Sequence, residues 1–288
     1  MFDGFALDEV DTGEALLRVR RGGNGPPLLL LHGHPQTHAM WHAVAPDLAR
    51  DRTVVAPDLR GYGASSKPPT APDHEPYSKR AMARDAVVLM RELGFERFSV
   101  AGHDRGARVA YRLALDNPDS VDKLAVLDVI PTGETWRRAD RRFALSWWHW
   151  SFLAQPAPLP ETLIGHDPDA YYFRGDRSRF HPDALAEYLR CASDPETIHA
   201  MCEDYRAGAT YDYDLDESDR RAGRRIRCPL LVLWAADGNL EEIFGDPLAI
   251  WRNWADSVRG RAIACGHYLA EEAPEETSRE LREFFTSR

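Results

Sequence analysis

The amino-acid sequence predicts an α/β fold, with a mostly parallel central sheet and an inserted cap of helices. Three observations lead to this prediction. Short apolar runs, clearest at 28–31 and 230–234, alternate with segments of helical periodicity, which is typical of parallel strands covered by helices on both faces. A strand pattern at 98–101 runs into a glycine-flanked turn and then into a helix pattern. Between 131 and 225 the strand alternation disappears, and Trp, Tyr, Pro and Arg become frequent.

The first part of the chain is expected to form the edge of the sheet and its first buried strand. Residues 6–21 alternate loosely between apolar and polar side chains, which favours opening antiparallel strands. The continuous apolar run at 28–31 fits a central strand that is buried on both faces. A loop with the sequence His-Gly-His-Pro follows at 32–35. Beyond it we expect a helix at 40–50 and a strand at 53–56.

The middle part is expected to carry the active site. A long helix over 77–93 would end at Gly94, which stands in the position of a glycine C-cap. The strand at 98–101 leads through the turn into a helix over 105–115, and another buried strand is expected at 124–127. In a parallel sheet, side chains at the carboxyl ends of neighbouring strands meet at one edge, so the active site is expected there.

The last part divides into a helical insertion and the end of the sheet. Residues 131–225 show no internal repeat and no flexible linker, and we interpret them as a mainly helical cap inserted between two strands. The sheet is expected to resume at 230–234 and 262–264, and a helix over 274–285 would end the chain. The predicted organisation is a core at 1–130 and 226–288, with the cap at 131–225.

Composition restricts the possible partners. The chain has 288 residues, 43% of them hydrophobic, and a formal net charge of −10. This charge argues against nucleic acid or an anionic membrane surface as a partner, because either requires a basic excess. An anionic substrate would therefore need a local cationic site. No stretch approaches about 18 consecutive apolar residues, and the N-terminus lacks a signal-peptide pattern, so we expect a cytoplasmic protein. The four widely spaced cysteines are expected to be free thiols.

The turn at 102–106 has the pattern of a nucleophile elbow, with Asp104 at its centre. Such a turn is sharp, so glycines stand where a Cβ would clash, and the central side chain points outward at the start of a helix. The usual central residue is serine. A carboxylate in its place can attack an electrophilic carbon without first losing a proton, which produces a covalent ester that an activated water must cleave.

The base for the second step is expected at His267, in a loop after the last strand. Its task would be to activate water against the Asp104 ester. Two carboxylates could orient its imidazole. Asp128 follows the strand after the elbow, and Asp237 follows the next strand along the chain. The residues alone do not separate the two, because each follows a strand and Asp is also a common turn residue.

Two arginines follow the predicted nucleophile on the same helix. Arg105 is adjacent to Asp104, and Arg108 lies one helical turn further on. On an arbitrary exposed helix they would pair with surface acids, but the start of this helix is expected to face the cavity beneath the cap. Two guanidinium groups there would suit a substrate carboxylate, which arginine binds bidentately.

The run Trp-Trp-His-Trp at 147–150 is the densest group of aromatic residues. Packing of the cap explains most of it. His149 and Trp150 nevertheless carry ring N–H groups, which a departing anion requires.

Four histidines near the N-terminus invite a metal-site interpretation. His38 and His42 would share one helical face, but no carboxylate or cysteine completes a site with known spacing. We therefore expect no metal ion. The other two histidines are His32 and His34.

Taken together, these residues closely resemble the fluoroacetate (haloacetate) dehalogenases of the α/β-hydrolase superfamily. The resemblance covers nearly the whole chain. Its most specific parts are Gly-His-Asp-Arg-Gly-Ala-Arg at 102–108 and His-Trp-Ser-Phe-Leu-Ala-Gln-Pro at 149–156, with further matches at 32–38, 124–128, 201–206 and 266–267.

The resemblance implies a reaction and a role for each matching residue. A short 2-haloacid would be hydrolysed to the 2-hydroxy acid and halide, with no organic cofactor or metal, by a homodimer. Asp128 would be preferred over Asp237 as the partner of the base. The implied roles are Asp104 as nucleophile, His267 as base, Asp128 as its acid, Arg105 and Arg108 for the carboxylate, His149, Trp150 and Tyr205 for the halide, and the His34 backbone amide near the reacting centre.

The sequence departs from the family pattern at two places. His34 stands where the family usually has Phe in the third position of His-Gly-x-Pro, and the cap between 167 and 182 is shorter than expected. Both affect the predicted substrate range more than the reaction type.

Two other functions remain open. An epoxide hydrolase would use the same Asp and His, with cap tyrosines to protonate the epoxide oxygen; the candidates are Tyr205, Tyr211 and Tyr213. A non-catalytic ligand-binding relative is disfavoured because no member of the predicted triad is missing.

Overall fold

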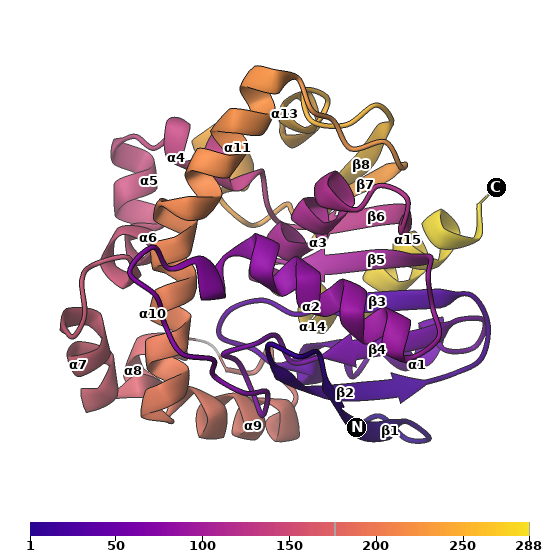
Figure 1. Ribbon diagram of the computed structural model, residues 1–288, viewed down its shortest axis with the longest axis horizontal. Coiled ribbons are helices and arrows are strands. Elements are labelled where there is room, and N and C mark those ends of the chain that lie inside the picture. Colours follow the sequence, from indigo (N-terminus) through magenta and orange to yellow (C-terminus); the bar gives the residue numbers. More distant parts are fainter. Residues whose placement is uncertain (176, 288) are drawn as a thin grey trace.

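Eight strands form one sheet in the computed structural model, which describes residues 1–175 and 177–287 (Figure 1). Their order across the sheet is β1-β2-β4-β3-β5-β6-β7-β8. The first two pairings, β1 with β2 and β2 with β4, are antiparallel, and the others are parallel. The strands are β1 Ala6–Asp11, β2 Leu16–Gly22, β3 Pro27–Leu31, β4 Thr53–Pro57, β5 Phe98–His103, β6 Val121–Leu127, β7 Leu230–Ala235 and β8 Val258–Ile263. The predicted α/β fold class is confirmed.

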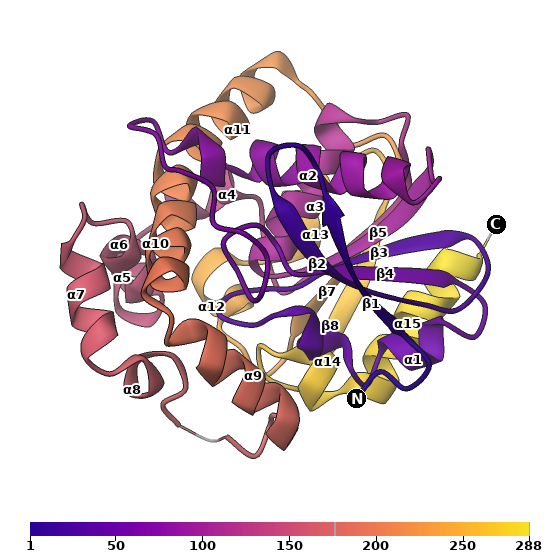
Figure 2. The same ribbon diagram turned by 60° about the horizontal axis from the view of Figure 1, so that its bottom comes forward.

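Helices cover both faces of the sheet (Figure 2). α2 (Lys79–Glu92) and α3 (Arg105–Asp116) pack together on one face, and α1 (Ala45–Leu48) and α15 (Pro274–Thr286) lie on the other. Every residue of β5 and of β7 is buried, as expected for strands covered on both sides. The core-side elements that remain are η1 His38–Trp41, η2 Glu75–Tyr77, α12 Leu240–Phe244, α13 Pro247–Trp251 and α14 Leu269–Glu272.

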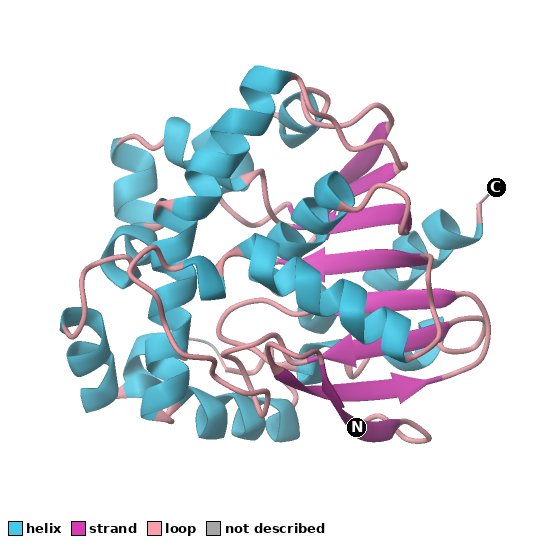
Figure 3. Ribbon diagram, viewed as in Figure 1, coloured by secondary structure: helices cyan, strands magenta, loops and turns pink. Residues whose placement is uncertain are grey.

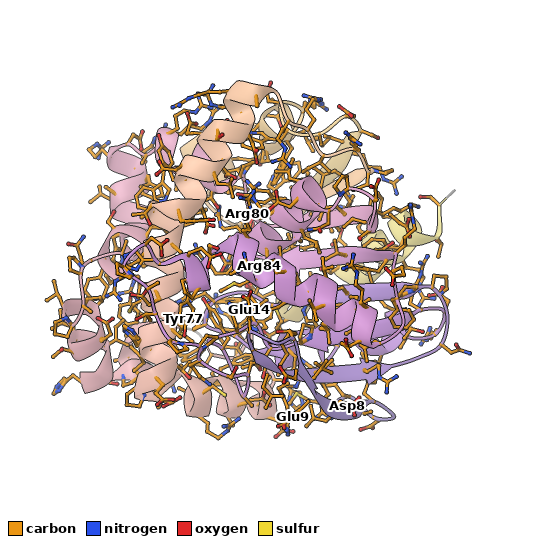
Figure 4. All side chains as sticks on the ribbon, viewed as in Figure 1. Asp8, Glu9, Glu14, Tyr77, Arg80 and Arg84 are labelled. Atoms are coloured by element: carbon orange, nitrogen blue, oxygen red, sulfur yellow. The ribbon has the colours of Figure 1, made fainter. Side chains whose placement is uncertain are left out.

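The opening hairpin is tied to α2 by charged groups. Glu14, in the turn between β1 and β2, accepts hydrogen bonds from Arg84 of α2 at 3.1 Å and from Arg60 at 3.0 Å (Figure 4). Arg60 is buried and also holds Asp85 of α2. The long helix begins at the Ser78 cap. These contacts fix α2 against the antiparallel edge of the sheet.

The segment between β6 and β7 is helical. Its helices lie beyond the carboxyl ends of the parallel strands (Figures 1 and 3). We propose 131–225 as the boundaries of this cap. Within the described residues no helix has the length and apolar character needed to cross a membrane. The helices are α4 Thr132–Arg137, α5 Arg141–Ser146, α6 Trp148–Leu153, α7 Leu159–His166, α8 Pro168–Tyr172, α9 Pro182–Ala192, α10 Pro195–Ala209 and α11 Tyr211–Ala222.

The continuous helix predicted at 40–50 is wrong. The segment forms the short 3-10 helix η1 and, after a break, the single turn of α1. Thr37 caps η1, and the backbone N–H of His38 donates to the buried carboxylate of Asp58 at 2.8 Å. Pro46 at the start of α1 has no N–H to continue a preceding helix. The segment is thus held by a hydrogen bond to Asp58 at its start and interrupted by Pro46 in its middle.

The last strand is longer than the predicted 262–264. β8 is the edge of the sheet, and its side chains are alternately exposed and partly buried. Its sequence, Val-Arg-Gly-Arg-Ala-Ile, has no apolar run because one face needs no apolar residues.

Candidate active site

The turn after β5 is a strained strand-to-helix junction centred on Asp104. Its φ of 48° and ψ of −116° lie outside the usual regions for a residue with a side chain. The turn closes only because three glycines surround it. A Cβ on Gly102 would lie 2.4 Å from the backbone of Gly106, and one on Gly106 would lie 2.3 Å from the carbonyl oxygen of His32. A Cβ on Gly33 would lie 2.7 Å from that of Asp104. The sequence prediction of an elbow therefore matches the observed geometry.

Asp104 faces a cavity of about 310 Å³ between the core and the cap. Both parts of the chain contribute to its wall. The predicted residues that line it from the core are His34, Asp104, Asp128 and His267, and those from the cap are His149, Trp150 and Tyr205.

His267 is paired with Asp128. Its Nδ1 lies 2.6 Å from Oδ2 of Asp128, and the other oxygen of Asp128 accepts a hydrogen bond from the amide of Ala235 at 3.0 Å. This arrangement holds the imidazole with Nδ1 toward the carboxylate and Nε2 free for a proton transfer. Asp237, the alternative acid, is exposed. Of the two candidate acids, Asp128 is the one that contacts the imidazole.

The charges of the site favour an ionised Asp104. Burial alone would raise the pKa of its carboxyl, but the positive charge of His267, with those of neighbouring basic groups, holds that pKa well below its usual range. Burial alone would lower the pKa of His267. Its hydrogen bond to Asp128 and the negative charges of Asp128 and Asp104 outweigh burial and raise that pKa above 6.5.

His34 contributes both its backbone and its ring. The backbone N–H donates to Oδ1 of Asp104 at 2.9 Å. The amide therefore lies beside the carboxylate that the sequence predicts to be the nucleophile. Burial lowers the pKa of the ring to about 3, so the imidazole is neutral. Its Nδ1 has no hydrogen-bond partner among the described residues, and the ring centroid lies 5.2 Å from that of Tyr205.

The three side chains expected around the halide lie together on the cap side. The ring of Tyr205, on α10, lies 6.0 Å from that of His149 and 5.8 Å from that of Trp150, both on α6. Burial lowers the pKa of His149 to about 4, and burial together with the charge of Asp104 raises the pKa of Tyr205. All three side chains are therefore neutral and retain N–H or O–H groups near neutral pH.

The two arginines lie behind the wall of the cavity. Neither Arg105 nor Arg108 is among the lining residues, and both are fully buried. The guanidinium carbon of Arg105 lies 4.1 Å from the centroid of the Tyr205 ring, and that of Arg108 lies 4.4 Å from the Trp150 ring. Among the described residues, Nη1 of Arg105 and Nε and Nη2 of Arg108 have no partner. The site thus has unused cationic donors directly behind its aromatic wall.

Several lining residues were not predicted from the sequence. Tyr171, Tyr172 and Arg174 enter the cavity wall from α8 and the loop after it. Arg174 is exposed, and its guanidinium carbon lies 5.3 Å from the ring of Trp148. The short segment 167–182 was expected to matter for the substrate range, but no sequence pattern indicated which of its side chains would point inward.

One group of possible metal ligands lies outside the cavity. Ligand atoms of His38, Asp58 and Glu187 lie within 4.8 Å of one another. These groups have hydrogen-bond partners within the protein: Nδ1 of His38 lies 2.8 Å from Asp58, and Glu187 accepts from Thr37 at 2.9 Å. One carboxylate directly follows β4 and the other lies on α9, which is why the spacing of the histidines did not reveal the cluster.

The sequence is similar to that of a known protein family and to those of individual proteins. Residues 26–274 match the family described as alpha/beta hydrolase fold. The chain is 48% identical to a fluoroacetate dehalogenase of Burkholderia sp, over 99% of this chain and 95% of that protein. It is 34% identical to a soluble epoxide hydrolase of Corynebacterium sp. (strain C12), over 88% of this chain and 87% of that protein.

A solved structure agrees with this grouping. The crystal structure of a Nostoc sp PCC 7120 protein, described as an alpha/beta hydrolase, has a TM-score of 0.97 to this chain at 53% sequence identity. The similarity covers 100% of each chain.

Proposed function

This chain belongs to the alpha/beta-hydrolase family and groups with a fluoroacetate dehalogenase, and on that premise we propose that it hydrolyses the carbon–halogen bond of a short 2-haloacid such as fluoroacetate or chloroacetate. The products are the 2-hydroxy acid and halide. One observation carries the proposal: the elbow presents a carboxylate, that of Asp104, to a cavity backed by unpartnered arginine N–H groups. Such a site suits a small anionic substrate that is attacked at carbon.

In the first step Asp104 attacks the carbon that bears the halogen. A carbon–oxygen bond forms, the carbon–halogen bond breaks, and the halide leaves with the bonding electron pair. Negative charge grows on the halogen during this step, so the N–H and O–H groups of His149, Trp150 and Tyr205 stabilise the transition state more than the bound substrate. Arg105 and Arg108 hold the carboxylate and offset its repulsion by Asp104.

In the second step His267 takes a proton from water, and the resulting hydroxide attacks the carbonyl carbon of the Asp104 ester. Asp128 stabilises the imidazolium that forms. The tetrahedral intermediate then collapses to the 2-hydroxy acid and the carboxylate of Asp104, and the proton held by His267 passes to the solvent. A homodimeric, cytoplasmic enzyme is part of the same proposal.

Free halide measurement tests this function. The purified protein would be incubated separately with fluoroacetate and chloroacetate, and fluoride, chloride and glycolate would be quantified. Equal amounts of halide and glycolate are expected. Chloride release without fluoride release would limit the proposal to the weaker carbon–halogen bonds, and no halide from either acid would refute it.

Epoxide hydrolysis is the second candidate, because phenol groups lie near Asp104. Tyr172 and Tyr205 both line the cavity, and a pair of tyrosines could protonate the oxygen of an opening epoxide. Tyr211 and Tyr213, which the sequence also suggested, are not among the lining residues. The unpartnered arginine donors favour the anionic substrate over the neutral one. Diol formation from a neutral epoxide such as styrene oxide, without halide release from haloacids, would reverse this preference.

Hydrolysis of the ester should accelerate as pH rises. His267 must be neutral to accept a proton, and its pKa in the free enzyme is raised above 6.5 by Asp128 and Asp104 against the effect of burial. The ester removes the charge of Asp104, so the pKa that controls hydrolysis should be lower than the pKa of His267 in the free enzyme. Single-turnover decay of the ester would be followed by rapid quenching and mass spectrometry across pH, and the free enzyme titrated by NMR. Decay that slows as His267 loses its proton would contradict the assigned role.

Arg174 should increase the rate of substrate capture. The protein carries a net charge of −10, which repels an anion, whereas Arg174 places a positive charge at the exposed part of the cavity wall. We expect Arg174→Gln to lower kcat/KM by about threefold at low salt, the scale of one exposed charge interaction, with kcat unchanged. The difference should shrink in high salt, because the screening length falls from about 10 Å at 0.1 M to about 3 Å at 1 M.

The matched control for Arg174 is Arg177→Gln. Arg177 is an exposed arginine on the same loop, is paired with Asp169 and is not among the lining residues. Equal effects of the two variants, or an effect of Arg174→Gln that does not depend on salt, would show that the position of this charge is unimportant.

A further inference from the structure

The carboxylate of Asp204 is the centre of a buried polar cluster behind the cavity wall. It lies on α10, next to Tyr205, and is fully buried. Its Oδ1 accepts from Nη2 of Arg105 at 2.6 Å, and its Oδ2 accepts from Nε of the same arginine at 3.0 Å. The hydroxyl of Tyr62 donates to Oδ2 at 2.6 Å, and Nζ of Lys79 donates to Oδ1. Each of the two carboxylate oxygens of Asp204 therefore accepts hydrogen bonds from two donors.

This contact determines which part of Arg105 remains free. Two parallel N–H···O bonds from Nε and Nη2 fix the plane of the guanidinium. Nη2 is held further by the backbone carbonyl of Asp204 at 2.8 Å. Only Nη1 is left, and this buried nitrogen has no partner among the described residues. A buried donor without an acceptor costs free energy, and a ligand that accepts from it removes that cost.

Arg108 contributes to the site in a different way. Its Nη1 donates to the carbonyl oxygen of Ile130 at 2.9 Å and approaches two threonine hydroxyls, all of them neutral acceptors. Arg105, in contrast, already faces a carboxylate. Among the described residues, no carboxylate lies within hydrogen-bonding distance of Arg108, so Arg108 supplies positive charge, whereas Arg105 supplies a directed N–H.

A lysine and a second aspartate complete the cluster. Nζ of Lys79 donates to Asp204 and lies 3.6 Å from a carboxylate oxygen of Asp212. The cluster therefore contains two cations and two carboxylates, and burial raises the pKa of Asp212 to about 6. With the charges balanced in this way, Asp204 can orient Arg105 without making the region behind the cavity negative.

We propose that Asp204 is a positioning residue for substrate binding: by holding Nε and Nη2 of Arg105 it presents Nη1 to the carboxylate of the substrate. The inference rests on the proposed haloacid hydrolysis, since it names the residue that prepares one of the two arginines for that substrate. Asp204 acts through Arg105 and does not touch the reacting atoms.

The variant Asp204→Asn tests this role. The Asn side chain has one accepting oxygen and an NH₂ group that cannot accept, so it cannot pair with all four donors. The guanidinium of Arg105 should therefore lose its fixed orientation. We expect KM for chloroacetate and the inhibition constant of glycolate to rise by about tenfold or more, the scale of one hydrogen bond to a charged group, with a smaller change in kcat. The inhibition constant of chloride ion, which needs only the halide side of the cavity, should stay the same. General damage to the site would weaken both inhibitors.

The matched control is Asp85→Asn. Asp85 holds the buried Arg60 through the same two-bond arrangement, at 2.5 and 2.6 Å. Neither residue lines the cavity. This variant should lose stability as Asp204→Asn does, but leave the inhibition constant of glycolate unchanged.

A second variant allows the role of Asp204 to be tested even if Asp204→Asn does not fold. Tyr62→Phe removes one donor from Asp204 without leaving a charge unpaired. Because Asp204 keeps both of its bonds to Arg105, this variant should raise the inhibition constant of glycolate only about twofold. Unchanged or tighter glycolate binding in a folded Asp204→Asn protein would overturn the inference. If that protein does not fold, unchanged glycolate binding in Tyr62→Phe overturns it instead. If the unmodified enzyme releases no halide, the proposed function is refuted, and the role of Asp204 is then tested by the dissociation constant of glycolate, measured by calorimetry, in place of the inhibition constant.

Discussion

Replacing Asp104 by Asn is expected to abolish halide release, with a loss on the order of a millionfold, the scale seen when a catalytic nucleophile is removed. Asn has nearly the same shape, so the elbow and its glycines can remain in place. Its amide is a poor nucleophile and carries no negative charge, so no ester can form. The measurement is fluoride and chloride release from the purified variant, with folding checked by circular dichroism.

The control for this experiment is Asp237→Asn. Asp237 also follows a strand near the cavity, but its side chain is exposed and is not among the lining residues. This variant should retain nearly full activity. Halide release by Asp104→Asn at a rate close to that of the unmodified enzyme would end the proposal of covalent catalysis.

The variant His267→Asn should release one equivalent of halide and then stop. The first step needs only the ionised Asp104, whereas hydrolysis of the ester needs a base, so the ester should accumulate. Loss of a triad base lowers turnover by on the order of a millionfold in a well-studied protease. After exposure to chloroacetate, the intact mass should increase by one carboxymethyl group, and peptide mapping should locate it on Asp104.

An exposed histidine provides the comparison. His181→Asn changes the same residue type on the cap, at an exposed position outside the cavity lining, and should turn over normally without an adduct. A His267→Asn protein that releases halide continuously, or that carries no adduct, would show that His267 is not the base.

The nucleophile elbow could be predicted because its requirements are local. A turn this sharp excludes a Cβ at Gly102 and Gly106, where side chains would meet backbone atoms at 2.4 and 2.3 Å. The residue between them, Asp104, must accept an unusual φ of 48°. These constraints leave a short, recognisable pattern in the sequence. The apolar runs of the buried strands are local for the same reason, and the α/β fold follows from them.

The carboxylate that pairs with His267 could not be predicted from local sequence pattern. Asp128 and Asp237 both follow strands, and nothing in their immediate neighbours separates them. The difference appears only when β6 and β7 lie side by side, because the amide of Ala235 then holds one oxygen of Asp128 and directs the other toward His267. Only the resemblance to the dehalogenase family favoured Asp128 over Asp237 before the structure was considered.

The side chains that contact the two arginines could not be predicted from the sequence either. The partner of Arg105 is Asp204, 99 residues further along the chain, and it is brought there by packing of α10 against the core. Helical periodicity shows which residues share a face, but it does not show which helix they will meet. Arg174 entered the cavity wall for a similar reason, since the direction of a loop side chain depends on its tertiary contacts.

The amide of His34 also determines the fate of individual atoms. Because it binds Oδ1 of Asp104, the other oxygen, Oδ2, is the one available for attack. Cleavage of the ester at the carbonyl carbon breaks the bond between that carbon and Oδ2, so Oδ2 leaves as the hydroxyl oxygen of the product. The oxygen of water takes its place in Asp104. In the proposed reaction, each product molecule thus carries away an atom of the protein, and the enzyme that begins the next cycle contains an oxygen taken from the solvent.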